Sequence, residues 1–282
     1  MALGTDALTA PQRELIERWL PGGSVVRDHS WGLVGMTVLE VLHDGARYIV
    51  KAGDVRDVQI VRELRAHREW LRPWAAAQRA PELVHGDPEA KLLITRYLAG
   101  NLVQGHAEEW RPDTYRQAGV LLAQLQGQLA VQDTEFEAAS QQKALQWLDA
   151  SNRIAPAIVA RLRAEVRSWD TPSVISVPTH GDWQPRNWLV CEGVVSVIDF
   201  GRAALRPAFT DIERLEAQQF RRHPELEAAF LGGYGRDPRD PELSRRNRLC
   251  ASIGTAVWAY QVGDEAFEQQ GHRMIAEALA AG

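Results

Sequence analysis

The chain has 282 residues, 45% hydrophobic and 24% charged, and its 32 Lys and Arg against 37 Asp and Glu give a net charge of −5. This size suits one large domain or two modest lobes, and the mild acidity argues against nucleic acid as a partner. With only Cys191 and Cys250, a disulfide framework and a CxxC zinc site are excluded, so we expect a reducing, cytoplasmic setting. The first residues lack the basic and apolar segments of a signal peptide, and no apolar run reaches the ~18 residues that a membrane span needs, so we expect neither feature. We expect a monomer or homodimer without a membrane partner.

Strand signals are concentrated before residue 100. Asp44 and Gly45 lie between two runs of β-type residues, which is typical of a tight hairpin. Thr9 and Gln12 have the spacing of a capping box, which predicts the start of a helix. The elements predicted in this part are strands over 25–50, 82–85 and 92–98 and helices after Thr9 and over 57–71.

Helical segments rich in Ala, Arg, Glu and Leu dominate after residue 105. One strand pair interrupts them, with its turn at Glu192 and Gly193. This asymmetry predicts an α+β fold with a small antiparallel-sheet lobe plus one helix over residues 1–98, and a larger, mostly helical lobe over 99–282. The elements predicted in the second lobe are helices over 112–130, 140–167, 211–231, 241–261 and 264–280 and strands over 188–191 and 194–198.

The residues with the clearest chemistry are Asp182, Asn187 and Asp199. A two-residue turn at Glu192-Gly193 places Asn187 across from Ile198 and therefore next to Asp199. Carboxylate and amide oxygens, with room for phosphate oxygens and water, are the usual ligands of Mg²⁺. Asp182 precedes this hairpin and is placed to orient and deprotonate an attacking hydroxyl, as phosphoryl transfer requires.

The motif His-Gly-Asp-x-x-x-x-Asn over 180–187, followed by Ile-Asp-Phe-Gly over 198–201, resembles the catalytic and metal-binding loops of the aminoglycoside phosphotransferase family. That family shares a bilobal protein-kinase-like fold with choline and homoserine kinases. The resemblance implies ATP or GTP as phosphoryl donor, Mg²⁺ as cofactor, and a nucleoside triphosphate and a small hydroxylated acceptor as partners. It implies that Asp182 is catalytic and that Asn187 and Asp199 bind the metal.

The resemblance also assigns a lysine and its glutamate partner in the first lobe. Lys51 closes the strand Tyr48–Lys51 and corresponds to the ligand of the α- and β-phosphates. Two glutamates of the following helix, Glu63 and Glu69, are candidates for its partner. Glu63 lies three residues from Ile60, on the side of the buried stripe, whereas Glu69 points roughly opposite. We therefore expect Glu63 to hold Lys51.

Two backbone segments would complete the nucleotide site by the same resemblance. Small residues at Ser30, Gly32 and Gly35 fit a turn whose backbone N–H groups cover the phosphates, although a plain hairpin turn has the same composition. The inter-lobe hinge would read the adenine edge through its backbone. The residues of this hinge are Arg96, Tyr97 and Leu98.

The catalytic loop also departs from common patterns. Gln184 stands where protein kinases carry Lys and many antibiotic kinases carry His, so a neutral amide replaces a cation or donor. Arg186 either supplies the missing charge or pairs with an acidic surface residue. His180 is expected to anchor the loop through hydrogen bonds. Asp211 is expected either to cap the following helix or to brace the catalytic loop.

The acceptor is expected to be compact, because only twelve positions separate Asp199 from Asp211 and leave no platform for a peptide. An acidic cluster near the C-terminus could hold an amine-bearing acceptor by charge-assisted hydrogen bonds, although a solvated helix face explains the same residues. The candidate acceptor-binding residues are Trp258, Tyr260, Asp264, Glu265 and Glu268.

Three functions fit the sequence. The first is an antibiotic-modifying O-phosphotransferase that acts on an aminoglycoside or another amine-rich natural product. The second is a metabolic kinase with choline, homoserine or a sugar-like alcohol as acceptor. The third is a nucleotide-binding pseudoenzyme. The joint presence of five functional side chains argues against it, because each costs desolvation or charge repulsion without a ligand. They are Lys51, Glu63, Asp182, Asn187 and Asp199.

Overall fold

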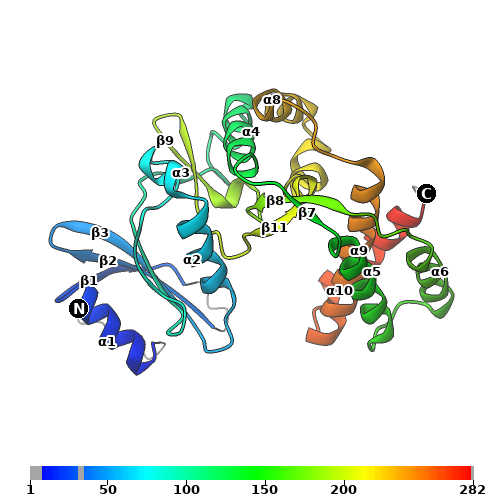
Figure 1. The fold of residues 1–282 in the computed structure, drawn as a ribbon, viewed down its shortest axis with the longest axis horizontal. Helices are drawn as coiled ribbons and strands as arrows, with labels where there is room; N and C mark the ends of the chain where they lie inside the picture. Colours follow the sequence, from blue (N-terminus) through cyan, green and yellow to red (C-terminus); the bar gives the residue numbers. More distant parts are fainter. Residues whose placement is uncertain (1–7, 31–34, 281–282) are drawn as a thin grey trace. The chain divides into compact units, whose positions relative to one another are not determined.

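A computed structural model of the chain describes residues 8–30 and 35–280. The chain forms two compact units (Figure 1). The first comprises Met1–Gln128, Pro178–Ala204 and Arg214–Arg236, and the second comprises Leu129–Val177, Leu205–Glu213 and Asp237–Gly282. The boundary predicted near residue 98 falls inside the first unit. The functional division into residues 1–98 and 99–282 stays a prediction.

A five-stranded antiparallel sheet begins the first unit, in the order β1-β2-β3-β5-β4. The predicted hairpin is confirmed, because His43 pairs with Ala46 and both turn residues, Asp44 and Gly45, have positive φ angles of 49° and 75°. The last strand ends at Arg96 and not at residue 98. The strands are β1 (Ser24–Asp28), β2 (Met36–His43), β3 (Ala46–Gly53), β4 (Leu83–Asp87) and β5 (Leu92–Arg96).

Helices α1 (Ala10–Trp19), α2 (Gln59–Glu69) and α3 (Arg72–Ala76) accompany this sheet. Thr9 and Gln12 form the predicted capping box at the start of α1. Ile16 of α1 belongs to the same buried cluster as the sheet residues Leu39 and Val50. Ile60 and Leu64 of α2 pack with Leu93 of β5. This packing fixes which side of α2 faces the sheet.

The helix predicted over 211–231 is wrong. The structure has a 3₁₀ turn η2 (Ala208–Asp211), a short helix α7 (Glu213–Leu215), a π-helical turn (Glu216–Phe220) and then α8 (Pro224–Tyr234). The break has a physical cause. Proline lacks a backbone N–H and disfavours helical geometry in the residue before it, so Pro224 begins a new helix.

Helices α4 (Pro112–Gln126) and α8 of the first unit lie side by side in Figure 1. The prediction placed the end of α4 at residue 130, four residues too late. Two glycines allow the close approach of the helices. A Cβ on Gly119 would come 2.1 Å from the Phe230 carbonyl oxygen, and a Cβ on Gly233 would come 2.0 Å from the Arg116 carbonyl oxygen. No side chain fits at either position.

The second hairpin of the first unit consists of β9 (Trp188–Cys191) and β10 (Val194–Val197). Its register, with Cys191 opposite Val194 and Trp188 opposite Val197, matches the predicted turn at Glu192-Gly193. The short strand β6 (Asn101–Leu102) extends this pair to three strands in the order β10-β9-β6. A single 3₁₀ turn, η1 (Pro185–Asn187), leads into β9.

Helices α5 (Phe136–Asp149), α6 (Pro156–Arg167), α9 (Pro241–Val262) and α10 (Glu265–Ala280) build most of the second unit. They enclose a core that includes Leu148, Leu162, Ile253 and Ile275. The single helix predicted over 140–167 is wrong: the chain turns at Asn152, whose side chain bonds the backbone of Ala150 and Ile154, and Pro156 starts the next helix.

A three-stranded sheet in the order β11-β8-β7 was not predicted. Its strands are β7 (Val131–Asp133), β8 (Val174–Thr179) and β11 (Ala204–Pro207).

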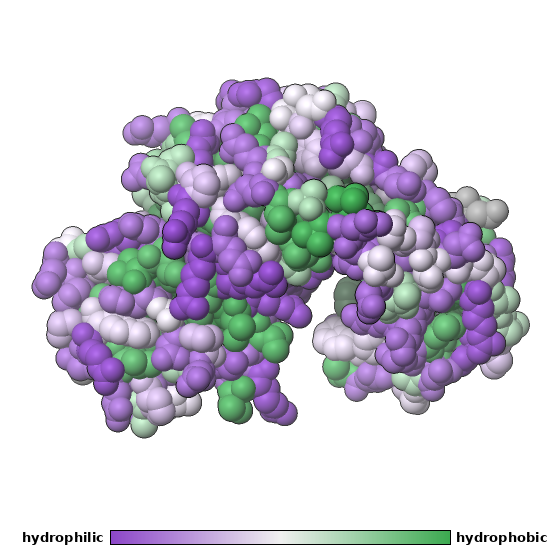
Figure 2. All heavy atoms as spheres, viewed as in Figure 1, coloured by the Kyte–Doolittle hydropathy of each residue, from purple (hydrophilic) through white to green (hydrophobic). Residues whose placement is uncertain are grey.

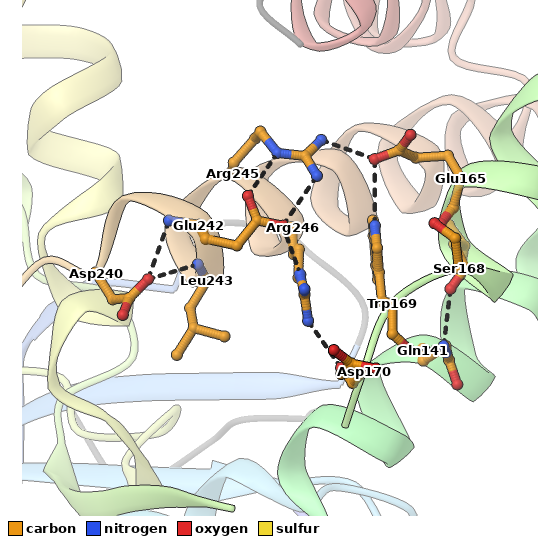
Figure 3. Close-up of polar contacts among 11 residues, drawn as sticks. Gln141, Glu165, Ser168, Trp169, Asp170, Asp240, Glu242, Leu243, Arg245 and Arg246 are labelled. Carbon is orange, nitrogen blue, oxygen red and sulfur yellow. Dashed lines mark hydrogen bonds and ion pairs between the residues drawn. The ribbon is translucent and has the colours of Figure 1, made fainter. Parts of the chain in front are cut away.

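The start of α9 carries a charge network that Figure 3 shows in detail. Asp240 caps the helix by accepting the N–H groups of Glu242 and Leu243, each at 3.0 Å. Glu242 in turn accepts hydrogen bonds from Arg245 and Arg246, and Arg245 also pairs with Glu165 at 2.9 Å.

Hydrophilic residues are spread over the face in view in Figure 2, with smaller hydrophobic groups between them. Among the described residues, no helix has the length and apolar character that crossing a membrane requires.

Candidate active site

The β9–β10 hairpin holds together the two loops that carry the motif. Asn187 ends η1, and its carbonyl oxygen accepts the N–H of Ile198 at 2.9 Å. Asp199, the next residue, has a φ of +67°. This left-handed conformation is uncommon outside glycine, asparagine and aspartate, and such strain gathers where surrounding structure enforces a functional geometry. The predicted opposition of Asn187 and Ile198 is confirmed.

Asp182 is buried, and donors surround its carboxylate. Oδ1 accepts from Gln184 Nε2 at 2.6 Å and lies 3.3 Å from Arg214 Nε. Oδ2 accepts from Arg186 Nη2 at 2.6 Å and from Asn187 Nδ2 at 3.0 Å. Burial raises the pKa of Asp182, but the Arg186 hydrogen bond and the charges of the neighbouring arginines outweigh it and hold this pKa below its ordinary value. The group is therefore an oriented carboxylate at neutral pH.

His180 connects the loop that carries Asp182 to the loop that carries Asp199. Its Nε2 lies 3.0 Å from the Ile198 carbonyl oxygen, and its Nδ1 accepts the backbone N–H of Asp182 at 3.2 Å. Since a carbonyl can only accept, these contacts fit the neutral tautomer with the proton on Nε2. The ring is fully buried against Trp183 and Phe200. His180 thus bonds both loops at once.

Lys51 of β3 connects α2 to the loop that carries Asp199. Its Nζ lies 2.9 Å and 3.0 Å from the two carboxylate oxygens of Glu63 and 3.2 Å from Asp199 Oδ1. Burial lowers the pKa of Lys51, but the charges of Asp199 and Glu63 outweigh it and raise that pKa above its ordinary value. The charge of Lys51 lowers the pKa of Asp199. The other candidate, Glu69, pairs with Arg65.

Two oxygens in this site fit a divalent cation. The Asn187 side chain makes two hydrogen bonds to described residues, both donated from Nδ2 to Asp182, so among the described residues its Oδ1 has no partner. Asp199 uses Oδ1 for Lys51, and its half-exposed side chain leaves Oδ2 without a described partner. No cluster of three or more His, Cys, Asp or Glu with metal-binding geometry lies in the part of the chain that the structure describes. An amide and a carboxylate oxygen suit Mg²⁺, which keeps several waters and binds substrate phosphates.

The three residues predicted to form the hinge differ in which of their main-chain groups are hydrogen-bonded. Tyr97 donates its N–H to the Arg47 carbonyl oxygen at 3.0 Å, and the Arg47 guanidinium lies 3.9 Å from the centre of the Tyr97 ring. The Arg96 N–H bonds to Glu82. By contrast, the main chain of Leu98 makes no hydrogen bond to any described residue. Of the three predicted hinge residues, Leu98 is therefore the one whose main-chain N–H and C=O both lack a hydrogen-bond partner among the described residues.

The segment predicted to cover the phosphates is described only at its ends. The Ser30 hydroxyl accepts the Val38 N–H at 3.0 Å. Gly35 has a φ of +104°, and a Cβ there would come 2.8 Å from Asp54 Oδ2, so the position requires glycine. Gly32 lies outside the described residues. The role of this segment stays a prediction.

The candidate acceptor residues all lie in the second unit, and most make contacts there. The Arg153 guanidinium lies 5.2 Å from the Tyr260 ring centre and pairs with Glu268. The Asp264 side chain accepts the N–H of Phe267 at 3.0 Å. Trp258 packs edge-on against Phe267, and Glu265 is exposed at 3.9 Å from Arg153. Asp211 is buried at the end of η2 in the same unit. Acceptor binding and loop bracing by these residues stay predictions.

Sequence reasoning missed Arg214 on α7. It reaches Asp182 from a helix that follows the motif by about thirty residues, and no local pattern marks it. For Arg186 the sequence left two roles open, supplying the missing charge or pairing with an acidic surface residue. In the structure its guanidinium donates to the buried Asp182 carboxylate.

Known proteins can be compared with this geometry. The model of the phosphotransferase enzyme family matches residues 36–245. No curated protein matches the sequence. Among solved structures, a thermostable mutant of aminoglycoside phosphotransferase APH(4)-Ia with ADP and hygromycin B has a TM-score of 0.71 at 18% identity, covering 97% of this chain and 99% of that one. The GDP and kanamycin complex of APH(2")-IIIa has a TM-score of 0.66 at 15% identity, covering 95% and 98%.

A macrolide 2'-phosphotransferase from Brachybacterium faecium has a TM-score of 0.60 at 20% identity, with 93% of this chain and 95% of that one covered. At such low sequence identity, these structural similarities support the fold alone. They confirm the predicted α+β, protein-kinase-like fold.

Proposed function

The chain belongs to the phosphotransferase enzyme family, and from that premise we propose that it transfers the γ-phosphoryl group of ATP or GTP to a hydroxyl of a small molecule. The observation that carries the proposal is the meeting, in one compact unit, of the Lys51–Glu63 pair, an oriented Asp182 and the two open oxygens of Asn187 and Asp199. Phosphoryl transfer needs positioning and charge neutralisation more than covalent chemistry, and these groups supply both.

We propose an antibiotic or another amine-rich natural product as the acceptor and the cytoplasm as the place of action. The support for the acceptor is that structural neighbours of the same fold include aminoglycoside and macrolide phosphotransferases.

In the proposed reaction, Lys51 binds the α- and β-phosphates while Glu63 fixes its side chain. Asp182 accepts a hydrogen bond from the acceptor hydroxyl and aims its oxygen at the γ-phosphorus. A bond forms between that oxygen and phosphorus, and the bond from phosphorus to the β–γ bridging oxygen breaks. The nucleoside diphosphate leaves with the electron pair, and the hydroxyl proton passes late to Asp182.

Asn187 Oδ1 and Asp199 would hold Mg²⁺ in this reaction. When bound, the ion neutralises charge on the β- and γ-phosphate oxygens. The protein's own contribution is to keep the two oxygens fixed. Asn187 is anchored by its two hydrogen bonds to Asp182, and Asp199 by Lys51 and by the strained backbone of its loop.

Asp182→Asn tests the proposal. The substitution keeps the size of the side chain but removes the proton acceptor, so we expect kcat to fall about 10²–10⁴-fold while MgADP binding is retained. Mass spectrometry of an acceptor library incubated with ATP would reveal the product, because each modified acceptor gains one HPO₃ unit. Titration calorimetry with MgADP would check the nucleotide site.

Asp113→Asn is the matched control, because Asp113 also accepts hydrogen bonds from an arginine and a glutamine, Arg116 and Gln117, but lies exposed on α4. It should leave turnover unchanged. Turnover by Asp182→Asn equal to that of the wild type would remove Asp182 from its role.

A further inference from the structure

Arginine side chains surround the proposed base. Asp182 is one buried carboxylate, and the positive charges of Arg186, Arg202 and Arg214 all act on it. The charges of Arg186 and Arg202 in turn disfavour the positive charge on Arg214. Three guanidinium groups therefore act on the carboxylate beside which phosphate would react.

The arginines approach Asp182 from different sides. Arg186 Nη2 and the metal-ligand amide Asn187 Nδ2 share the oxygen Oδ2, at 2.6 Å and 3.0 Å. Arg214 and the neutral Gln184 take the other oxygen, Oδ1. Arg186 therefore lies on the side of the carboxylate that faces the proposed metal ligands.

The charge of Arg186 also reaches Asp199. It helps to lower the pKa of Asp199, although Lys51 is the larger cause. The guanidinium is thus within electrostatic range of both the proposed base, Asp182, and the proposed metal ligand, Asp199.

The Arg186 guanidinium has unused hydrogen-bonding capacity. It has five N–H donors, and its contact with Asp182 uses Nη2. No further hydrogen bond joins it to the described residues, and its side chain is 37% exposed. Lys51, by comparison, is committed to Glu63 and Asp199. Arg186 can therefore keep its bond to Asp182 while donating to a ligand.

We propose that Arg186 is a further catalytic residue, whose guanidinium donates hydrogen bonds to the oxygens of the γ-phosphoryl group as it moves to the acceptor. This inference rests on the proposed function and extends it to the residue that stabilises the transition state. Arg186 forms no covalent bond and gives up no proton. Its Nη2 donates to the Asp182 carboxylate, while its remaining N–H groups donate to the transferring group and neutralise charge there.

A transition-state mimic tests this role without knowledge of the acceptor. MgADP with aluminium fluoride imitates the transferring phosphoryl group beside ADP, whereas MgADP alone lacks it. For Arg186→Ala we expect affinity for MgADP–aluminium fluoride to fall about 10²-fold or more, and affinity for MgADP to stay within about 3-fold of the wild type. Calorimetry measures both affinities.

Two further variants sharpen the test. Arg186→Lys keeps the charge but loses the planar fork, so it should recover only part of the mimic's affinity. Arg116→Ala removes an arginine from an exposed pair with Asp113 and should change neither affinity. Added guanidinium ion should partly restore mimic binding to Arg186→Ala.

Two results would overturn the inference: unchanged affinity of Arg186→Ala for the mimic, or an equal loss of affinity for the mimic and for MgADP. A wild-type protein that binds no MgADP would instead overturn the proposed function, together with this inference.

Discussion

Asp199 combines a left-handed backbone conformation with a proposed role as a metal ligand, and the two can be separated experimentally. Its φ of +67° suits asparagine as well as aspartate, so Asp199→Asn should preserve the loop while removing the charge. We expect the variant to fold and to lose most of the Mg²⁺-dependent part of its nucleotide affinity, because an amide oxygen is a weaker ligand for Mg²⁺ than a carboxylate. Calorimetry with ADP, in Mg²⁺ and in EDTA, measures that part directly.

Asp44→Asn is the control for this substitution. Asp44 also has a positive φ, of 49°, but lies exposed in the β2–β3 turn. It should behave like the wild type in both titrations. Equal Mg²⁺ dependence in Asp199→Asn and in the wild type would exclude Asp199 as a metal ligand.

At this scale the sequence predicted contacts wherever a local rule applied. The two-residue turn set the hairpin register and so placed Asn187 against Ile198, and the helical period selected Glu63 over Glu69 as the partner of Lys51. No such rule links Arg214 to Asp182, because tertiary packing alone brings them together. Distant charges of this kind are the part of the site that a single sequence hides.

At the scale of elements, the contact between α4 and α8 depends on glycine. Gly233 of α8 lies against the backbone of Arg116, where a Cβ would come 2.0 Å from the carbonyl oxygen. Gly233→Ala must therefore push the helices apart, and we expect it to lower the free energy of unfolding by about 2 kcal/mol or more. Urea unfolding followed by far-UV circular dichroism measures the loss.

The preceding residue provides the matched control. Gly232 is exposed on the same helix, and a Cβ there would meet nothing within 4 Å. Gly232→Ala should stabilise the protein by about 0.5–1 kcal/mol, because alanine has the higher helix propensity. If both variants shifted the unfolding midpoint in the same direction, close helix packing would not be the cause.

The predicted helices and strands were wrong where a single residue or a short, distant strand determines the structure. Helical composition continues through 140–167 and 211–231, but Pro156 and Pro224 each begin a new helix. The strand Val174–Thr179 was missed because it pairs with Val131–Asp133, a segment of three residues that is remote in sequence. Composition predicted the fold class, whereas breaks and short strands depend on single residues and on distant partners.

At the scale of the whole molecule, arginine contacts make the fold dependent on ionised carboxylates. In three places a hydrogen bond from an arginine is the main cause that lowers the pKa of a carboxyl group. The pairs are Arg116 with Asp113, Arg239 with Asp237, and Arg245 with Glu242. A carboxyl whose pKa is lower in the folded than in the unfolded state stabilises the fold when it is ionised. Acid should therefore weaken the molecule at several places at once.

Glu242 is the sharpest case, because hydrogen bonds from Arg245 and Arg246 lower its pKa from 4.5 to about 2 (Figure 3). Its stabilising effect is complete above the unfolded value of 4.5 and is lost as the pH falls toward 2. The side chain is half exposed, so solvent screening limits the effect to about 1 kcal/mol. Glu242→Gln should lower the urea midpoint at pH 7 and approach the wild type as the pH falls below 4.5. Glu14→Gln, at an exposed glutamate of α1 that makes no ion pair with a described residue, serves as the reference. A Glu242→Gln difference that stayed constant with pH would show that the arginine contacts contribute nothing.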